Sequence, residues 1–259
     1  MAASRETFVE CDGCRLYLRR AGAGAPLLFL HGAVGFPGWL PFFERLSDRF
    51  DLLAPDHPSF GRSTTPPWLD EVGDLAYFYL DLIDRLGLER IHLAGHSLGG
   101  WIALEMAVRA PERLRSLTLL NSAGIRIKGK PIADILVMDR AETTRLAIAD
   151  PRLVEAQLAM PMTPEMEQTL AQNRVSAARL AWQPRFFNPK LAKWLHRVKT
   201  PTRIVWGDRD GIVPPDYAAA FADLIPDSRV VMVEGTAHSP HVEKPDAVLA
   251  AITELAAGT

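Results

Sequence analysis

Residues 90–101 read RIHLAGHSLGGW, and this stretch decides the fold. The apolar run IHLAG is followed by Ser97 and then by GGWIALEMAVRA, which has the composition of a helix. A serine at a sharp turn between a buried strand and a helix is typical of a nucleophile elbow. The flanking glycines suit such a turn, because two backbone segments approach each other closely there. Whether Ser97 is a nucleophile or only a turn residue depends on the partners that the chain supplies.

The composition is that of an ordinary globular protein of 259 residues, with 48% hydrophobic and 23% charged residues. A formal net charge of -2 gives no electrostatic reason to bind nucleic acid or an anionic membrane, so a small-molecule substrate is expected. The first twenty residues contain no apolar signal segment, and no apolar run approaches the ~18 residues of a membrane-spanning helix. We therefore predict a cytoplasmic protein that binds neither nucleic acid nor membrane.

Cys11 and Cys14 form a C-x-x-C pair, a spacing that also occurs in zinc and redox sites. A structural zinc needs four ligands, and the sequence has no second cysteine pair. Asp12-Gly13, between two strand-like runs, is instead a signal for the two-residue turn of a β-hairpin. We expect a hairpin here, and no metal or cofactor in the protein.

Short apolar runs alternate with helical patterns along most of the chain, as expected for parallel strands buried on both faces. The clearest helical spacing lies within residues 72–86. Between residues 126 and 198 helical stretches continue without a strand-like run. The sequence therefore predicts an α/β fold, with a mostly parallel sheet flanked by helices. Residues 1–125 and 199–259 form this core, and residues 126–198 form a helical insertion.

A serine is a weak nucleophile until a base takes its proton, so a histidine should lie near Ser97. His238 follows the last strand-like run, and open parallel sheets place their sites in loops after the carboxyl ends of strands. His241, three residues further on, is the weaker candidate. The histidine needs a carboxylate to orient it, and Asp208 and Asp210 both follow another strand-like run. Spacing alone does not separate these two.

Acyl transfer also requires N–H donors that stabilise an oxyanion. Leu98 follows the serine at the start of the predicted helix, where N–H groups lack intrahelical partners. The second donor is expected in the loop HGAVG, residues 31–35, with Ala33 best placed; a plain glycine-rich turn is the alternative. His96, beside the serine, is expected to point away from the site.

With these residues in view, the chain resembles the α/β-hydrolase superfamily over almost everything outside the insertion. The segments that carry the resemblance, in family order, are HGAVG, APDHPSFGRS, GHSLGG, WGDRDGIVP and GTAHSPHVEKP. The resemblance implies Asp210 as the acid, because Gly207, Asp210 and Pro214 match the family's G-x-x-D-x-x-x-P pattern. It also implies that the insertion is a cap over the pocket. Dehalogenases and epoxide hydrolases of this fold carry an aspartate where this chain has Ser97, so those chemistries are not expected.

We predict a serine hydrolase, in the first place a carboxylesterase that forms an acyl-enzyme on Ser97. A carbon-carbon hydrolase of meta-cleavage products uses the same triad and stays open, as does a small-molecule receptor that retains it. Arg174 could bind a substrate carboxylate and Trp182 an apolar acyl or aryl group. Most methionines and aromatic residues of the insertion are expected to form its own core. A homodimer formed through the insertion is an open alternative to a monomer.

Overall fold

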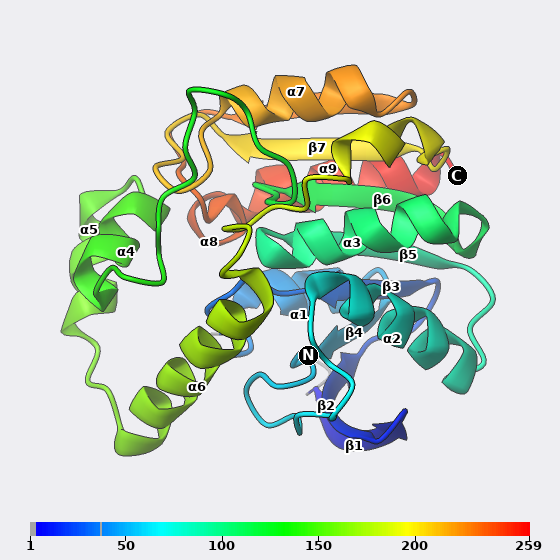
Figure 1. Ribbon diagram of the computed structural model, residues 1–259, viewed down its shortest axis with the longest axis horizontal. Coiled ribbons are helices and arrows are strands. Elements are labelled where there is room, and N and C mark those ends of the chain that lie inside the picture. The colour runs from blue at the N-terminus through cyan, green and yellow to red at the C-terminus, as the bar shows by residue number, and fades with distance from the viewer. Residues whose placement is uncertain (1–3, 37) are drawn as a thin grey trace.

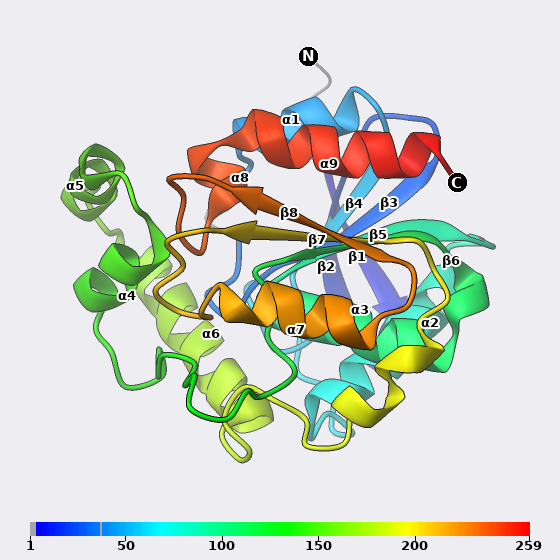
Figure 2. The ribbon, with the colours of Figure 1, turned by 90° about the horizontal axis from the view of Figure 1, so that it is seen from above.

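The computed structural model describes residues 4–36 and 38–259, which form one sheet of eight strands with helices on both faces (Figures 1 and 2). The strands lie in the order β1-β2-β4-β3-β5-β6-β7-β8, and β2 runs opposite to all the others. Their bounds are β1 Arg5–Cys11, β2 Cys14–Ala21, β3 Pro26–Leu30, β4 Asp51–Pro55, β5 Ile91–His96, β6 Leu114–Leu120, β7 Thr202–Gly207 and β8 Ser228–Val233. The predicted α/β fold with a mostly parallel sheet is confirmed.

Helices cover both faces of the sheet, which explains why the central strands are apolar throughout. Figure 2 shows α1 (Pro41–Ser47) and α9 (Pro245–Ala257) on one face, and α2 (Val72–Arg85), α3 (Leu98–Arg109) and α7 (Asp216–Leu224) on the other. Successive side chains of a strand point to opposite faces. In β3, Leu28 therefore packs in the cluster below α2 and α3, while Phe29 packs in the cluster below α1 and α9.

The predicted helix at residues 72–86 is α2, and its sequence explains both of its ends. Asp74 in the first turn accepts a hydrogen bond from the N–H of Glu71 at 2.9 Å, which satisfies a free backbone donor. Leu75 and Tyr79 are fully buried one helical turn apart. Gly87, with φ at +68°, then ends the helix in a conformation that favours glycine.

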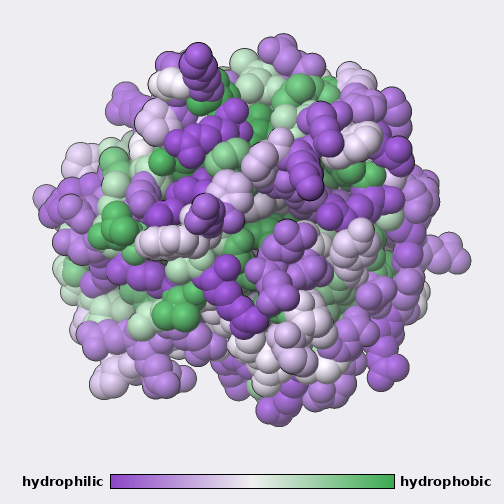
Figure 3. All heavy atoms as spheres, viewed as in Figure 1, coloured by the Kyte–Doolittle hydropathy of each residue, from purple (hydrophilic) through white to green (hydrophobic). Residues whose placement is uncertain are grey.

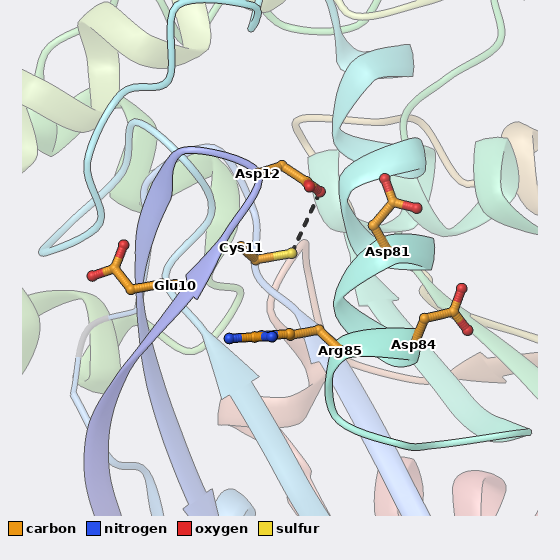
Figure 4. Close-up of a pocket in the computed structure, with 6 residues that line it drawn as sticks. All are labelled: Glu10, Cys11, Asp12, Asp81, Asp84 and Arg85. Atoms are coloured by element: carbon orange, nitrogen blue, oxygen red, sulfur yellow. Dashed lines mark hydrogen bonds between the residues drawn. The ribbon is translucent and has the colours of Figure 1, made fainter.

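The C-x-x-C pair closes the β1–β2 hairpin, as predicted. Asp12 and Gly13 both have positive φ, as a type I′ turn requires, and Cys11 pairs with Cys14 across the turn. Burial raises the pKa of the Cys11 thiol to about 12 and that of Cys14 to about 11, so neither is a ready nucleophile. Figure 4 shows Cys11 directed towards the carboxylate of Asp12, in a hollow of about 390 Å³ beside α2.

The segment from residue 126 to residue 198, called the insertion below, joins β6 to β7. It contains α4 (Arg140–Ala147), α5 (Pro151–Ala159), α6 (Pro164–Ala181) and the short 3-10 helix η2 (Ala192–Arg197). Figures 1 and 2 show α4 and α5 on the side of the molecule towards which β7 and β8 point. The insertion therefore lies at the edge where the loops after the parallel strands meet.

Several large apolar side chains of the insertion face outwards. Met160, Met166, Trp182 and Trp194 are exposed, whereas Phe186 is buried. The expectation that these residues belong to the core of the insertion is therefore wrong for the first four. In Figure 3 hydrophilic side chains cover most of the visible face, with apolar patches between them. Within the described part of the chain, no helix is long and apolar enough to cross a bilayer.

The close contact between α3 and β3 leads to a prediction about stability. A Cβ atom at Gly99 would overlap with the carbonyl oxygen of Leu30. We expect Gly99→Ala to lower the free energy of unfolding by about 1–3 kcal/mol, because backbone segments would have to move apart. Gly258→Ala is the control, since a Cβ there meets only ordinary contacts. Urea unfolding gives the difference; equal midpoints for both variants would contradict the close approach.

Candidate active site

Ser97 occupies the sharp turn between β5 and α3. Its backbone has φ of 54° and ψ of -113°, a combination that costs a non-glycine residue on the order of 1–3 kcal/mol. Gly95 and Gly99 allow the turn, because a Cβ at Gly95 would overlap with the carbonyl oxygen of Gly99. Two backbone hydrogen bonds hold it, from the Ser97 N–H to Leu120 and from the Ala123 N–H to Ser97. The structure thus has the strand-turn-helix geometry that the sequence indicated.

Asp210 and His238 lie in the loops after β7 and β8 and contact each other directly. The Nδ1 of His238 lies 2.8 Å from Oδ2 of Asp210, and both residues are nearly buried. Because a carboxylate only accepts hydrogen bonds, Nδ1 carries the proton and Nε2 is free to accept one. Asn121 donates to the same carboxylate oxygen, and the N–H groups of Ile212 and Val213 donate to the other. The acid is therefore held on both oxygens.

Asp208, the other carboxylate that the spacing left open, is exposed and does not reach the histidine. Its Oδ1 accepts a hydrogen bond of 3.3 Å from the N–H of Thr236. The hydrogen bond to His238 comes from Asp210. This geometry favours Asp210, as the resemblance implied.

His96 links the serine turn to the loop of the histidine. Its Nε2 donates to the backbone oxygen of His238 at 2.8 Å, and the two rings are 4.9 Å apart. The expectation that His96 points away from the site is therefore wrong. His241 also packs against His96, with ring centroids 4.7 Å apart. Burial, and then the nearby His238, lower the pKa of His241 to about 3, so it remains a neutral neighbour of the site.

The two predicted oxyanion donors lie on segments next to Ser97. Leu98 is the first residue of α3, so its N–H has no intrahelical acceptor. In the loop after β3, the N–H of Gly35 donates to the carbonyl of Gly32 and closes a turn that contains Ala33. A Cβ at Gly32 would lie 3.3 Å from the Cβ of Ser97, so this loop passes directly over the serine. The arrangement is compatible with an oxyanion hole of two backbone N–H groups.

Two buried histidines support the loop that carries Ala33, a role that the sequence did not indicate. The N–H of His57 donates to Nε2 of His31, and Nε2 of His57 donates to the backbone oxygen of His31. Burial lowers the pKa of His31 to about 3 and that of His57 well below its ordinary value, so both stay neutral. The signal was present, since each of the motifs HGAVG and APDHPSFGRS contains one of them.

The structure does not bring the two predicted substrate contacts, Arg174 and Trp182, to the triad. Arg174 is exposed on α6, and its guanidinium donates to the backbone oxygens of Ile135 and Met138 within the insertion. Trp182 is half-exposed, with its ring stacked under the guanidinium of Arg185. Both side chains are thus engaged with the insertion itself.

A hollow lies along α3 beyond the serine turn. It has a volume of about 650 Å³ and is bounded by α2, by α3 and by the end of the insertion. Trp101, Glu105 and Arg109 line it at successive turns of α3. Neither Ser97 nor His238 lines it, so this hollow is separate from the candidate active site.

Comparison with known protein families identifies the family of the chain. Residues 25–245 match the model of the α/β hydrolase fold family, so the chain belongs to this family and is an α/β-fold hydrolase.

Three curated relatives are each about 30% identical to this chain. One is the dihydrolipoyllysine-residue acetyltransferase component of the acetoin cleaving system of Cupriavidus necator, at 30% identity over 94% of this chain and 67% of the relative. The putative carbamate hydrolase RutD of Azorhizobium caulinodans is 30% identical over 89% of this chain and 91% of its own length. Lipase 1 of Psychrobacter immobilis is 30% identical over 86% of this chain and 74% of its own length.

Two solved structures have the same overall fold. A bacterial membrane phospholipase A, described as a virulence factor, superimposes with a TM-score of 0.83 at 25% identity, over 98% of this chain and 86% of its own. The 2-hydroxy-6-oxo-6-phenylhexa-2,4-dienoate hydrolase of Rhodococcus sp. strain RHA1 superimposes with a TM-score of 0.81 at 22% identity. The match covers 98% of this chain and 99% of that hydrolase. At this identity the second likeness concerns the fold alone.

The position of the two carboxylates predicts unequal effects of their loss. We expect Asp210→Asn to lower kcat by on the order of a thousandfold or more, because an amide no longer fixes the proton on Nδ1 of His238. The same change at the exposed Asp208 should alter kcat by no more than about twofold. Steady-state hydrolysis of p-nitrophenyl butyrate by both variants gives the ranking. A reversed order would show that the assignment of the acid is wrong.

The buried histidines predict a loss of stability in mild acid. Burial is the main cause of a lowered pKa at His31, His57, His92, His96 and His241. Below about pH 6.5 the unfolded chain takes up protons that the folded protein does not, so the free energy of unfolding falls with pH. The loss begins near pH 6.5 and continues towards the lowered pKa values, which are about 4 for His92 and about 3 for His31.

His92 provides the test of this dependence, because it lies in β5 away from the serine turn. We expect His92→Gln to flatten the slope of unfolding free energy against pH by about 1 kcal/mol per pH unit between pH 6 and pH 5. Urea unfolding at several pH values measures the slope. Identical slopes for the variant and the parent protein would mean that His92 titrates in the folded state as it does in the unfolded chain.

Proposed function

We propose that the protein is a carboxylesterase that forms an acyl-enzyme on Ser97. The observation that carries this proposal is the strained Ser97 turn, held through His96 against the loop of a histidine that is itself hydrogen-bonded to Asp210. Backbone strain at a serine is retained only where the surrounding structure enforces it, and such residues cluster at functional sites. The proposed substrates are small to medium esters.

The proposed reaction uses each group in the state described above. Nε2 of His238 accepts the proton of Ser97 as its oxygen attacks the ester carbonyl. The N–H groups of Leu98 and Ala33 stabilise the negative oxygen of the tetrahedral intermediate. His238 then donates the proton to the leaving alcohol, and water releases the acid by the same route in reverse. Throughout, Asp210 stabilises the imidazolium that forms.

Ester hydrolysis is favoured over the other chemistries by the relatives and by the insertion. One relative is named a lipase, and lipases cleave carboxylic esters. Cleavage of a meta-cleavage product would require a binding group for the substrate carboxylate, and the candidate Arg174 binds carbonyl groups of the insertion instead. We further propose that the insertion acts as a cap over the site and selects the acyl group.

A stopped-flow time course with p-nitrophenyl acetate, butyrate and octanoate tests the proposal. We expect multiple turnovers on at least one ester, and their loss in Ser97→Ala, because no other hydroxyl occupies the turn. A dienoic meta-cleavage product is included as a competing substrate.

Each alternative has its own outcome in this experiment. Preferential cleavage of the dienoic diketone would replace the esterase by a carbon-carbon hydrolase. A single burst without turnover would indicate a receptor that retains the triad. Undiminished ester turnover by Ser97→Ala would remove Ser97 as the nucleophile in all of these functions.

A further inference from the structure

Glu243 joins the loop of the candidate base to the insertion. It is the last residue of the short helix α8 (Pro240–Glu243), and its side chain folds back towards residue 237. Oε2 accepts a hydrogen bond of 2.7 Å from the N–H of Ala237, the residue before His238. Oε1 accepts hydrogen bonds of 2.7 and 3.1 Å from the N–H groups of Ala149 and Asp150, at the start of α5. One carboxylate thus binds both segments at once.

Backbone hydrogen bonds join the same two regions on either side of Glu243. The N–H of Ser239, the residue after the base, donates to the carbonyl of Ala147 at 3.0 Å. The N–H of Gly211, the residue after the acid, donates to the carbonyl of Leu146 at 3.3 Å. The end of α4 therefore contacts the loops of both Asp210 and His238. These contacts join backbone groups, whereas Glu243 contributes a carboxylate side chain. Hydrogen bonds to a charged group are about twice as strong as those between neutral groups, so the Glu243 contacts are the strongest of the set.

Asn173 makes the corresponding connection to the loop that carries Ala33. It lies on α6 and is only 3% exposed. Its Nδ2 donates to the carbonyl of Val34 at 2.9 Å, and its Oδ1 accepts from the N–H of Gly61 at 2.8 Å. Val34 follows Ala33 in the turn described above, so the amide of Asn173 fixes the Val34–Gly35 peptide group, two peptide groups after the one that carries the N–H of Ala33.

The two loops are shaped to admit Asn173. A Cβ at Gly35 would overlap with its Nδ2, and Gly35 has φ of +85°, a conformation that favours glycine. One turn further along α6, Ser176 forms a second contact with the loop after β4, where its Oγ lies 2.8 Å from Oγ of Ser59. The buried face of α6 is thus fitted to the loops after β3 and β4.

We propose that Glu243 and Asn173 are positioning residues through which the insertion holds the base loop and the oxyanion loop in their reactive geometry. The proposal rests on the esterase function proposed above. It assigns the insertion a part in catalysis in addition to covering the site: the reactive arrangement exists only while the insertion is seated on both loops. Both side chains bind backbone groups of the loops and the insertion, so each acts through the residue that it holds.

The two residues should affect different chemical steps. An alkyl ester leaves as an alkoxide that needs the proton of His238, whereas p-nitrophenolate leaves without one. A misplaced base should therefore slow an ethyl ester more than a p-nitrophenyl ester. A misplaced oxyanion donor should slow both esters equally, because both reactions pass through the same negative intermediate.

Two conservative variants separate these effects. Glu243→Gln replaces one accepting oxygen by a donor, so it keeps the hydrogen bond to only one of the two segments. Asn173→Asp retains the acceptor for Gly61 but places a negative oxygen against the carbonyl of Val34. The matched controls are Glu254→Gln on α9 and Gln168→Glu on α6, which make the same kinds of change at exposed positions.

Measurements are made per active site, counted by labelling Ser97 with a fluorophosphonate, so that misfolded molecules do not contribute. For Glu243→Gln we expect kcat/KM to fall about tenfold on p-nitrophenyl butyrate and about a hundredfold on ethyl butyrate. For Asn173→Asp we expect kcat/KM to fall about tenfold on both esters. Hydrogen exchange of the native protein gives a readout independent of chemistry: Glu243→Gln should speed exchange of segments 147–152 and 237–243 together.

The outcomes distinguish this proposal from the proposed function. If Glu243→Gln and Asn173→Asp have values of kcat/KM per active site within about twofold of their controls, the positioning proposal is overturned. Equal losses on the two esters for Glu243→Gln, with exchange no faster in 147–152 than elsewhere, would also overturn it. If the protein cleaves no ester, the esterase proposal fails, and the exchange result alone decides whether Glu243 couples the two segments.

Discussion

The backbone conformation of Ser97 constrains its whole surroundings. A serine with positive φ at the end of a buried strand requires neighbours without side chains, and the chain supplies them on two segments. Gly95 and Gly99 lie in the turn itself, and Gly32 lies on the loop that crosses it. The same close approach brings the N–H of Leu98 and the turn containing Ala33 to the serine. The strain and the candidate oxyanion hole thus have one geometric cause.

Much of the fold could be predicted from the sequence because its signals are local. Continuous apolar runs indicated the parallel strands, Asp12-Gly13 indicated the hairpin, and the spacing of Leu75 and Tyr79 indicated α2. Each of these patterns is set by residues that are neighbours along the chain. A turn motif indicated Ser97, and a rule of topology indicated the loops of Asp210 and His238, since each loop follows a strand of a parallel sheet. The family resemblance then selected Asp210 over Asp208.

The residues that sequence reasoning missed act across long separations in the chain. Asn121, directly after the neighbouring strand β6, supports Asp210, and Asn173 reaches the oxyanion loop from the insertion. No local pattern distinguishes these amides from surface residues. For the same reason Arg174 and Trp182 could not be placed, because the direction of a side chain on α6 depends on how the helix packs. His96 was misjudged because its partner is a backbone oxygen 142 residues away.

The contacts between the insertion and the active-site loops have a consequence for how such a protein can diversify. The hydrogen bonds described between the insertion and the base and acid loops use main-chain groups of the insertion, among them the carbonyls of Leu146 and Ala147 and the N–H groups of Ala149 and Asp150. Almost any amino acid supplies these groups. Side chains at these positions can therefore change with the substrate while the connection to the catalytic loops persists. In the proposed esterase, the acyl preference could then change on this part of the insertion while the loops of Asp210 and His238 keep their positions.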